Sequence, residues 1–367
     1  MQVKSLKAKN FRNLSELYLE FGTGINILHG DNAQGKTNIL EAVHLFSMGK
    51  SGRTPRDSEL IKHDCDGAEL TLEFSDKERT STGEIKLFRS KKKLISVNEV
   101  PLKRNSELVG RFRVVYFGPE YLGLVKEGPK QRRKNTDILI SQLRPKYFSA
   151  ISDLKKIVES KNALLKMDKP NLTMLEIMNT KFAAISAEVI AYRSYYIKKI
   201  GEIAGKIQGE ISGGKEELEV RYQSCIGDVS ELSTEQIKEI LEKKLSEASK
   251  REIDMHEALI GPHREDIGYF INGKDAKAYA SQGQQKTIVL VQKLAEVQLI
   301  EEETGEPPVL LLDDIMSELD RKRQGFILNH IKNMQIIITC TDTEGFEIDD
   351  QAVLFKVEDA RVTLDNA

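Results

Sequence analysis

The sequence is short of several residue types, and each shortage narrows what the chain can be. Trp is absent and aromatic residues make up 6% of the 367 residues, which argues against a recognition surface of stacked rings. Cys65, Cys225 and Cys340 lie far apart, so neither a disulfide framework nor a zinc site is expected. The apolar runs are far shorter than the roughly 18 residues that span a membrane, and the N-terminus lacks the apolar core of a signal peptide. We therefore expect a soluble, cytoplasmic protein.

The net charge is also small, but the charges are unevenly distributed. The chain has 55 basic and 57 acidic residues, a balance that by itself does not indicate nucleic-acid binding. From Lys86 to Lys146, however, 16 residues are basic and five acidic, an excess of 11 that leaves the remainder at about minus 13. A chain that is acidic on average can still present one basic face. The segment is either such a binding face or a solvated charged surface.

The apolar pattern predicts an α/β part and a helical part. Strands are expected in the first 30 residues (including Ile25–Leu28), in residues 68–100, and at Arg113–Phe117, Ile267–Ile271, Val309–Leu312 and Gln335–Thr339, with helices at Thr37–Met48 and from Gln284 to about Glu303. Between about Lys130 and Ala258, apolar residues recur at three- and four-residue spacing, which predicts helices interrupted near Lys169-Pro170 and Ser212–Gly214. The sustained heptads of a long coiled coil are missing.

Gly30–Thr37 matches the P-loop pattern G-x-x-x-x-G-K-[ST] and lies between a predicted strand and a predicted helix. In a P-loop, backbone N–H groups wrap the phosphates, Lys36 reaches the β- and γ-phosphates, and the Thr37 hydroxyl binds Mg²⁺. The residues expected to bind nucleotide are Gly30, Asp31, Asn32, Ala33, Gln34, Gly35, Lys36 and Thr37. The alternative is an ordinary Gly-rich turn.

Two further segments fit the same chemistry. The apolar strand Val309–Leu312 ends in Asp313 and Asp314; beside a P-loop, Asp313 would hold Mg²⁺ through water and Asp314 would polarise the attacking water. A second phosphate-binding site is expected where a helix begins, because its N-terminus carries a partial positive charge. The residues at this helix start are Ser281, Gln282, Gly283 and Gln284. Taken alone, the first segment could be an ordinary strand end and the second a plain N-cap at Ser281. The separation of about 270 residues between the P-loop and Asp313 points to a split nucleotide-binding domain.

These motifs, with Ser317–Asp320 as a D-loop, resemble those of ABC-type ATPases of the SMC class, and more closely those of the RecF family of bacterial recombination mediators. The resemblance covers the whole chain and is carried by Asn10–Asn13, Ser51–Thr54, Gly261–Asp266, Ser281–Thr287 and Leu312–Asp320. It implies an α/β fold: a split ABC-type P-loop ATPase head of mixed β-sheet and helices, plus a mainly helical second lobe without a long coiled coil. Residues 1–118 and 304–367 would form the ATPase lobe, and residues 119–303 the helical lobe with the signature motif.

The resemblance also implies a function. Two chains would sandwich two ATP molecules with Mg²⁺, so that the signature motif of one chain completes the site of the other. Asp314 and Lys36 would be catalytic, Arg12 and Asn13 would join the ATP site, and Ser317 and Asp320 would belong to the D-loop. The homodimer would bind duplex, gapped or junction DNA and work with RecR, and functionally with RecO and RecA, with slow DNA-dependent hydrolysis as the release switch. The residues expected to contact DNA are Arg53, Lys91, Lys92, Arg104, Arg111, Arg132, Arg133 and Lys134.

The chain departs from the ABC pattern at several positions. Asp314 stands where a Glu is usual. Gly118-Pro119-Glu120 follows Phe117, where a Q-loop glutamine is expected. The switch histidine is missing from the segment Thr339–Asp342, and Thr341 is the residue expected to replace it. Gly261–Arg264 is either a structural turn or a contact to DNA or nucleotide through His263 or Arg264. Arg12 and Arg53 either contact phosphates or are solvated.

Two other functions compete. A small-molecule P-loop kinase would not explain the Ser281 motif, and a transporter ATPase subunit would need a membrane partner.

Overall fold

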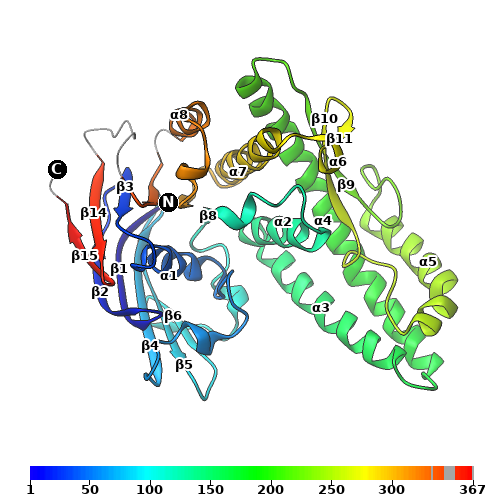
Figure 1. The fold of residues 1–367 in the computed structure, drawn as a ribbon. Helices are drawn as coiled ribbons and strands as arrows, with labels where there is room; N and C mark the ends of the chain where they lie inside the picture. Colours follow the sequence, from blue (N-terminus) through cyan, green and yellow to red (C-terminus); the bar gives the residue numbers. More distant parts are fainter. Residues whose placement is uncertain (332–333, 343–351, 366–367) are drawn as a thin grey trace. The chain divides into compact units, whose positions relative to one another are not determined.

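The computed structural model describes residues 1–331, 334–342 and 352–365, and the chain divides into two compact units (Figure 1). Unit 1 comprises Met1–Gly123 and Lys293–Ala367, and unit 2 comprises Leu124–Gln292. From the sequence, these boundaries were predicted after residues 118 and 303. Among the described residues, no helix has the length and apolarity that a membrane span requires.

Unit 1 contains, in its described part, two six-stranded sheets. The first is antiparallel, in the order β2-β1-β4-β5-β6-β7. Its strands are β1 (Gln2–Phe11), β2 (Leu14–Glu20), β4 (Gly67–Ser75), β5 (Thr80–Phe88), β6 (Leu94–Val97) and β7 (Val100–Pro101). Buried residues alternate with half-buried or exposed ones along β4 and β5, so one face packs on the core and the other is partly open to solvent.

The second sheet has the order β15-β14-β3-β13-β12-β8. Its strands are β3 (Ile25–His29), β8 (Val114–Phe117), β12 (Val309–Asp313), β13 (Ile336–Cys340), β14 (Val353–Glu358) and β15 (Arg361–Leu364). All neighbouring pairs are parallel except β14 with β15. Every residue of β12 and β13 is buried, as expected for central strands of a parallel sheet.

Helix α1 (Lys36–Met48) joins the two sheets into one core. It contacts β1 and β4 of the first sheet and β8, β12 and β13 of the second, and 11 of its 13 residues are buried. The helix ends at Gly49, whose φ of 65° suits a glycine C-cap. The remaining short elements of unit 1 are η1 (Asp57–Leu60), η2 (Asn105–Glu107), η3 (Pro119–Tyr121), η4 (Met316–Glu318) and α8 (Arg321–His330).

Unit 2 is mainly helical, with α2 (Pro129–Leu143), α3 (Pro145–Leu165), α4 (Leu172–Ser212), α5 (Thr234–Met255) and α6 (Ala276–Tyr279). A small antiparallel sheet has the order β11-β10-β9, with β9 (Leu218–Gln223), β10 (Asp266–Ile271) and β11 (Lys274–Asp275). Helix α7 (Gln282–Thr304) begins in unit 2 and contains the boundary after Gln292.

The helix ends follow from local sequence. Pro129 and Pro145 occupy first helical positions, where a missing N–H costs nothing. The Asn171 side chain accepts from the Met174 N–H to start α4, which ends at Gly213 with φ 64°. The start of α4 at Asn171 and its end at Gly213 correspond to the two interruptions that the sequence predicted.

Candidate functional site

The loop between β3 and α1 needs its glycines. Gly30 and Gly35 have φ of 147° and 110°, and Ala33 has φ 66°. A Cβ on Gly30 would lie 2.2 Å from the Val357 carbonyl oxygen, so a larger residue would displace the backbone. Helix α1 begins immediately afterwards, and the N–H groups at a helix start have no preceding turn to bind, although that of Asn38 donates to the Gly35 carbonyl at 3.0 Å. This combination favours an anion at the loop.

Lys36 is buried and adds a positive charge to the same loop. Its Nζ donates to the carbonyl oxygens of Gly30 and Asp31 at 2.7 and 2.9 Å. These bonds hold the ammonium group across the loop, where phosphate oxygens of a nucleotide would compete for it.

The Asp313 carboxylate accepts hydrogen bonds from three hydroxyl groups, each on a different element. Thr37 Oγ1 donates to Asp313 Oδ1 at 2.9 Å, Thr339 Oγ1 donates to the same atom at 2.8 Å, and Tyr116 Oη donates to Oδ2 at 2.7 Å. The structure thus brings together Thr37 and Asp313, which are 276 residues apart. A hydroxyl and a carboxylate are the oxygen ligands that Mg²⁺ prefers, so the donor set fits this ion.

Asp314 follows β12 in a left-handed conformation, with φ 49°. Its backbone N–H donates to Thr339 Oγ1 at 2.9 Å, and its carbonyl accepts from Ser317 Oγ at 2.8 Å. Burial raises the pKa of the Asp314 carboxyl; Lys36 opposes that shift and Asp313 adds to it. Further along, Asp320 caps α8 by accepting from the Arg323 N–H at 2.9 Å.

One buried carboxylate on α1 holds the two arginines that were expected near phosphates. Arg12 Nε and Nη2 donate to Glu41 at 2.9 and 2.8 Å, Arg53 Nη1 donates at 3.1 Å, and Ser51 Oγ at 2.5 Å. Burial alone would raise the pKa of Glu41, but the hydrogen bonds from Arg12 and Ser51 bring it below its ordinary value. Arg53 keeps 44% of its side chain exposed, so it can still reach outward.

Asn13 packs against the P-loop itself. Its Oδ1 accepts from Asn38 Nδ2 at 2.8 Å. A Cβ on Gly35 would lie 2.9 Å from the Asn13 side chain. The structure therefore places Asn13 beside the P-loop, and its role in binding ATP stays a prediction.

The signature segment begins α7 with a reciprocal cap. The Gln284 N–H donates to Ser281 Oγ at 3.2 Å, and the Ser281 N–H donates to Gln284 Oε1 at 2.9 Å. Gln284 Nε2 also donates to Glu216 Oε1 at 2.9 Å. Ser281 and Gln282 are exposed, whereas Gly283 and Gln284 are half-buried. Locally the segment is an N-cap with its first residues on the surface.

The structure corrects the expectation for Arg132. This arginine is 3% exposed, and it pairs with both carboxylate oxygens of Asp266 at 2.7 Å and donates to three backbone carbonyls. All three nitrogens of this buried guanidinium donate within unit 2, so the group is not exposed to a DNA phosphate. Arg133 is half-buried and donates to the Glu265 carbonyl, whereas Lys134 is exposed.

Gly261–Asp266 is held by internal contacts of unit 2. Arg193 Nη1 donates to the Pro262 carbonyl at 2.7 Å, and His263 Nε2 and Arg264 Nε lie 3.2 and 3.1 Å from the Ala258 carbonyl oxygen. Glu265 accepts from Ser224 Oγ and the Cys225 N–H at 2.7 and 3.0 Å. Of the two interpretations of this segment, the structural turn accounts for these contacts.

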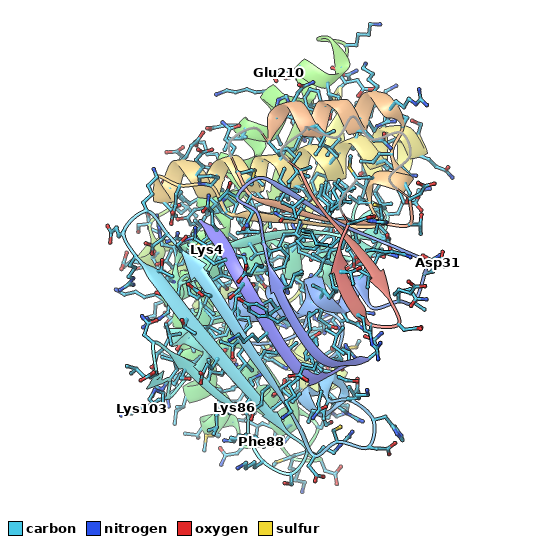
Figure 2. All side chains as sticks on the ribbon, turned by 90° about the vertical axis from the view of Figure 1, so that its left-hand side faces the viewer. Lys4, Asp31, Lys86, Phe88, Lys103 and Glu210 are labelled. Carbon is cyan, nitrogen blue, oxygen red and sulfur yellow. The ribbon has the colours of Figure 1, made fainter. Side chains whose placement is uncertain are left out.

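The basic stretch from Lys86 to Lys146 is divided between the two units, so it does not form one continuous face of one unit. On the outer face of the antiparallel sheet, Lys86 pairs with Glu69, which pairs in turn with Lys9, and this row alternates in charge. Figure 2 shows Lys86 and Lys103 toward the same end of this sheet, away from Asp31 of the P-loop. Beyond the row, Lys91, Lys92, Lys103, Arg104 and Arg111 are exposed in unit 1.

Sequence reasoning missed Tyr116, Thr339 and Glu41. Tyr116 and Thr339 are polar residues within apolar strands, and Glu41 is an acid on the buried stripe of a helix. A polar residue at a position predicted to be buried was the available signal, because buried polar groups require partners.

Comparisons with known proteins agree with this geometry. The family model described as RecF/RecN/SMC N terminal domain matches residues 2–363. A DNA replication and repair protein RecF from Acetivibrio thermocellus is 42% identical over 351 residues, 95% of each chain. Two solved structures, of the recombination mediator proteins RecF-ATPrS and RecF-ATP in the RecFOR pathway, are 38% identical and cover 99% of this chain and 98% and 97% of theirs, with TM-scores of 0.93 and 0.91. The predicted ATPase-head fold with its helical second part is confirmed. The chain belongs to the RecF/RecN/SMC N terminal domain family and, within it, to the RecF proteins of DNA replication and repair.

Proposed function

We propose that the chain is an ATP-dependent DNA-binding protein of recombinational repair and a weak, DNA-dependent ATPase that dimerises on ATP. The observation that carries this proposal is the meeting of Thr37 with Asp313 at 2.9 Å, with Asp314 next in the chain. A P-loop and an acidic strand end that converge across 276 residues are the parts that nucleotide hydrolysis needs.

Each residue has a defined task in this proposal. Lys36 and the first-turn N–H groups of α1 bind the β- and γ-phosphates. Thr37 and Asp313 would hold Mg²⁺, which supplies charge neutralisation at those phosphates when bound. Asp314, the next residue after the Mg²⁺ ligand Asp313, accepts a proton from the attacking water.

The signature residues act on a second copy. Ser281 and Gln282 are exposed at the N-terminus of α7, and this helix end suits the γ-phosphate held by another chain. ATP would then join two chains into a homodimer, and hydrolysis would release it. Ser317 and Asp320 of the D-loop segment contribute to the same interface.

The proposed DNA and protein partners are inferred from the similar RecF proteins. The solved RecF structures are described as parts of the RecFOR pathway, which supports RecR and RecO as partners. We further propose that the protein helps to load RecA. We expect the dimer to bind duplex DNA beside single-strand gaps. The exposed Lys91, Lys92, Arg104 and Arg111 of unit 1 and Lys134 of unit 2 are the proposed phosphate contacts, with Arg53 and Arg133 in secondary roles.

The test is a size measurement by light scattering with ATP, ADP or no nucleotide, repeated with gapped DNA. ATP alone should produce the dimer, gapped DNA should bind to it, and Lys36→Met should remain monomeric. A protein that stays monomeric with ATP but phosphorylates a small molecule would be a kinase instead, and the proposal would fail.

A further inference from the structure

A single buried hydroxyl joins the two carboxylate residues that end β12. Thr339 lies in β13 opposite Asp313 in the parallel pairing, and it is 0% exposed. Its Oγ1 lies 2.8 Å from Asp313 Oδ1 and 2.9 Å from the backbone nitrogen of Asp314. The proposed function uses both aspartates and gives Thr339 no task.

The chemistry of the three groups fixes the direction of both hydrogen bonds. The Asp314 N–H can only donate, so the Thr339 oxygen accepts from it. The hydroxyl proton then points to Asp313, whose carboxylate can only accept when ionised. One side chain therefore ties the carboxylate of Asp313 to the backbone of Asp314.

Asp314 depends on such support more than Asp313 does. Its φ of 49° is a conformation that residues other than glycine seldom adopt. Among the described contacts of its backbone, the N–H is held by Thr339 and the carbonyl by Ser317. Asp313, in contrast, keeps Thr37 and Tyr116 as further partners.

We propose that Thr339 is a positioning residue for hydrolysis, which fixes the turn at Asp314 relative to Asp313 so that the carboxylate of Asp314 is aimed at the attacking water. This inference rests on the proposed ATPase function. The described hydrogen bonds of the Thr339 side chain go to Asp313 and Asp314 and not to Lys36. Thr339 therefore acts on the chemical step and leaves ATP binding to Lys36 and Thr37. Thr341, the residue predicted to replace the switch histidine, is exposed beyond the end of β13.

The experiment compares Thr339→Val, which keeps the shape but removes the hydroxyl, with Thr339→Ser, which keeps the hydroxyl. Single-turnover hydrolysis in Thr339→Val should fall on the order of 100-fold, the cost of a small misplacement of a reacting group. Its ATP affinity and its ATP-driven dimer should stay nearly unchanged, and Thr339→Ser should recover most of the rate. Thr71→Val, the same change on the outer face of β4, should hydrolyse as the wild type does.

Three results would overturn the inference: a wild-type rate in Thr339→Val, a Thr339→Ser as slow as Thr339→Val, or equal losses of rate and ATP affinity, which would assign Thr339 to packing alone. A thermal unfolding curve for each variant identifies a global fold defect. If Thr339→Val has such a defect, the hydrolysis rate of Thr339→Ser tests the proposed role of the hydroxyl instead. Failure of the proposed function looks different, because the wild-type protein itself would then neither dimerise on ATP nor hydrolyse it.

Discussion

The side chain of Asp314 combines partial burial with proximity to Lys36 and Asp313, and burial gives it a raised pKa. Asp314→Asn keeps the shape and removes the proton acceptor. We expect single-turnover hydrolysis to fall by about 10²- to 10⁴-fold and the ATP-bound dimer to persist longer. A wild-type hydrolysis rate in Asp314→Asn would move the general base to another residue.

Lys36→Met should instead lose ATP affinity, because it removes the positive charge that binds the phosphates.

His263 should make the stability of the fold sensitive to acid. Burial lowers the pKa of His263, and the neighbouring cations Arg264, Lys161 and Arg133 lower it further, against the Ala258 carbonyl. Nε2 points to that carbonyl, whereas Nδ1 is buried with no hydrogen-bond partner among the described residues. A proton on Nδ1 would therefore be a buried donor without an acceptor, which is costly.

The sign of the effect follows from the lowered pKa. The unfolded chain takes up the proton at about pH 6.5 and the folded chain only at lower pH, so stability falls as the pH drops below about 6.5. The slope from this residue is at most about 1.4 kcal/mol per pH unit. His263→Gln should flatten urea-unfolding stability between pH 5 and 6.5, whereas His63→Gln, at an exposed position, should not. An unchanged slope in His263→Gln would assign the acid sensitivity elsewhere.

Arg132 and Lys134 are close in sequence, but we expect only Arg132 to contribute strongly to the stability of the fold. Arg132→Ala would leave Asp266 without its buried partner and should cost about 3–5 kcal/mol of unfolding free energy. Lys134→Ala, at an exposed position, should change stability by less than about 0.5 kcal/mol. Chemical denaturation of both variants measures the difference. Equal, small losses would show that Arg132 is not structural.

At the scale of elements, the exposed N-terminus of α7 gives the sharpest test of the composite site. Ser281→Arg would place a long cation where a second chain's γ-phosphate is proposed to bind. We expect ATP binding by the monomer to persist, because Lys36 and Thr37 belong to the P-loop, while dimerisation and hydrolysis are lost. Ser281→Ala, which removes only the cap hydroxyl, is the milder control. Normal ATP-driven dimers in Ser281→Arg would contradict the composite site.

Elements were predictable from sequence where the signal was local. Proline and glycine marked the breaks before and after α4, and the apolar run before Asp313 marked β12. The break between α2 and α3 at Arg144 was not predicted. Tyr116 and Thr339 were not predictable as partners of Asp313, because their positions depend on which strands are neighbours. The order β3-β13-β12-β8 is set by long-range packing, which a single sequence does not display.

The same limit explains the error at Arg132. Local charge density marked Lys86–Lys146 as basic, but burial depends on residues distant in sequence. Asp266, which neutralises Arg132, is 134 residues away. A run of basic residues in sequence is therefore not a basic surface until its partners are known.

At the scale of the whole molecule, DNA binding should depend on exposed cations from both units. Lys91 and Lys92 are exposed in unit 1, and Lys130 and Lys134 in unit 2. Each lost phosphate contact should reduce the slope of log affinity against log salt by about 0.9. Lys91→Ala with Lys92→Ala, and separately Lys130→Ala with Lys134→Ala, should each flatten the slope by up to about 1.8. Binding of gapped duplex DNA is measured by fluorescence anisotropy with ATP present.

The matched control for both double variants is Lys7→Ala with Lys9→Ala. Lys9 lies between Glu16 and Glu69, and Lys7 lies over the Tyr18 ring, on the outer face of the antiparallel sheet. Because Glu16 and Glu69 offset Lys9 and the Tyr18 ring holds Lys7, the control should keep the wild-type salt slope. All three double variants should still bind ATP. If only one double variant changes the slope, the DNA contacts belong to that unit alone. If the control changes it and the other two do not, the DNA lies on the mixed-charge face, and the assignment to the exposed cations is wrong.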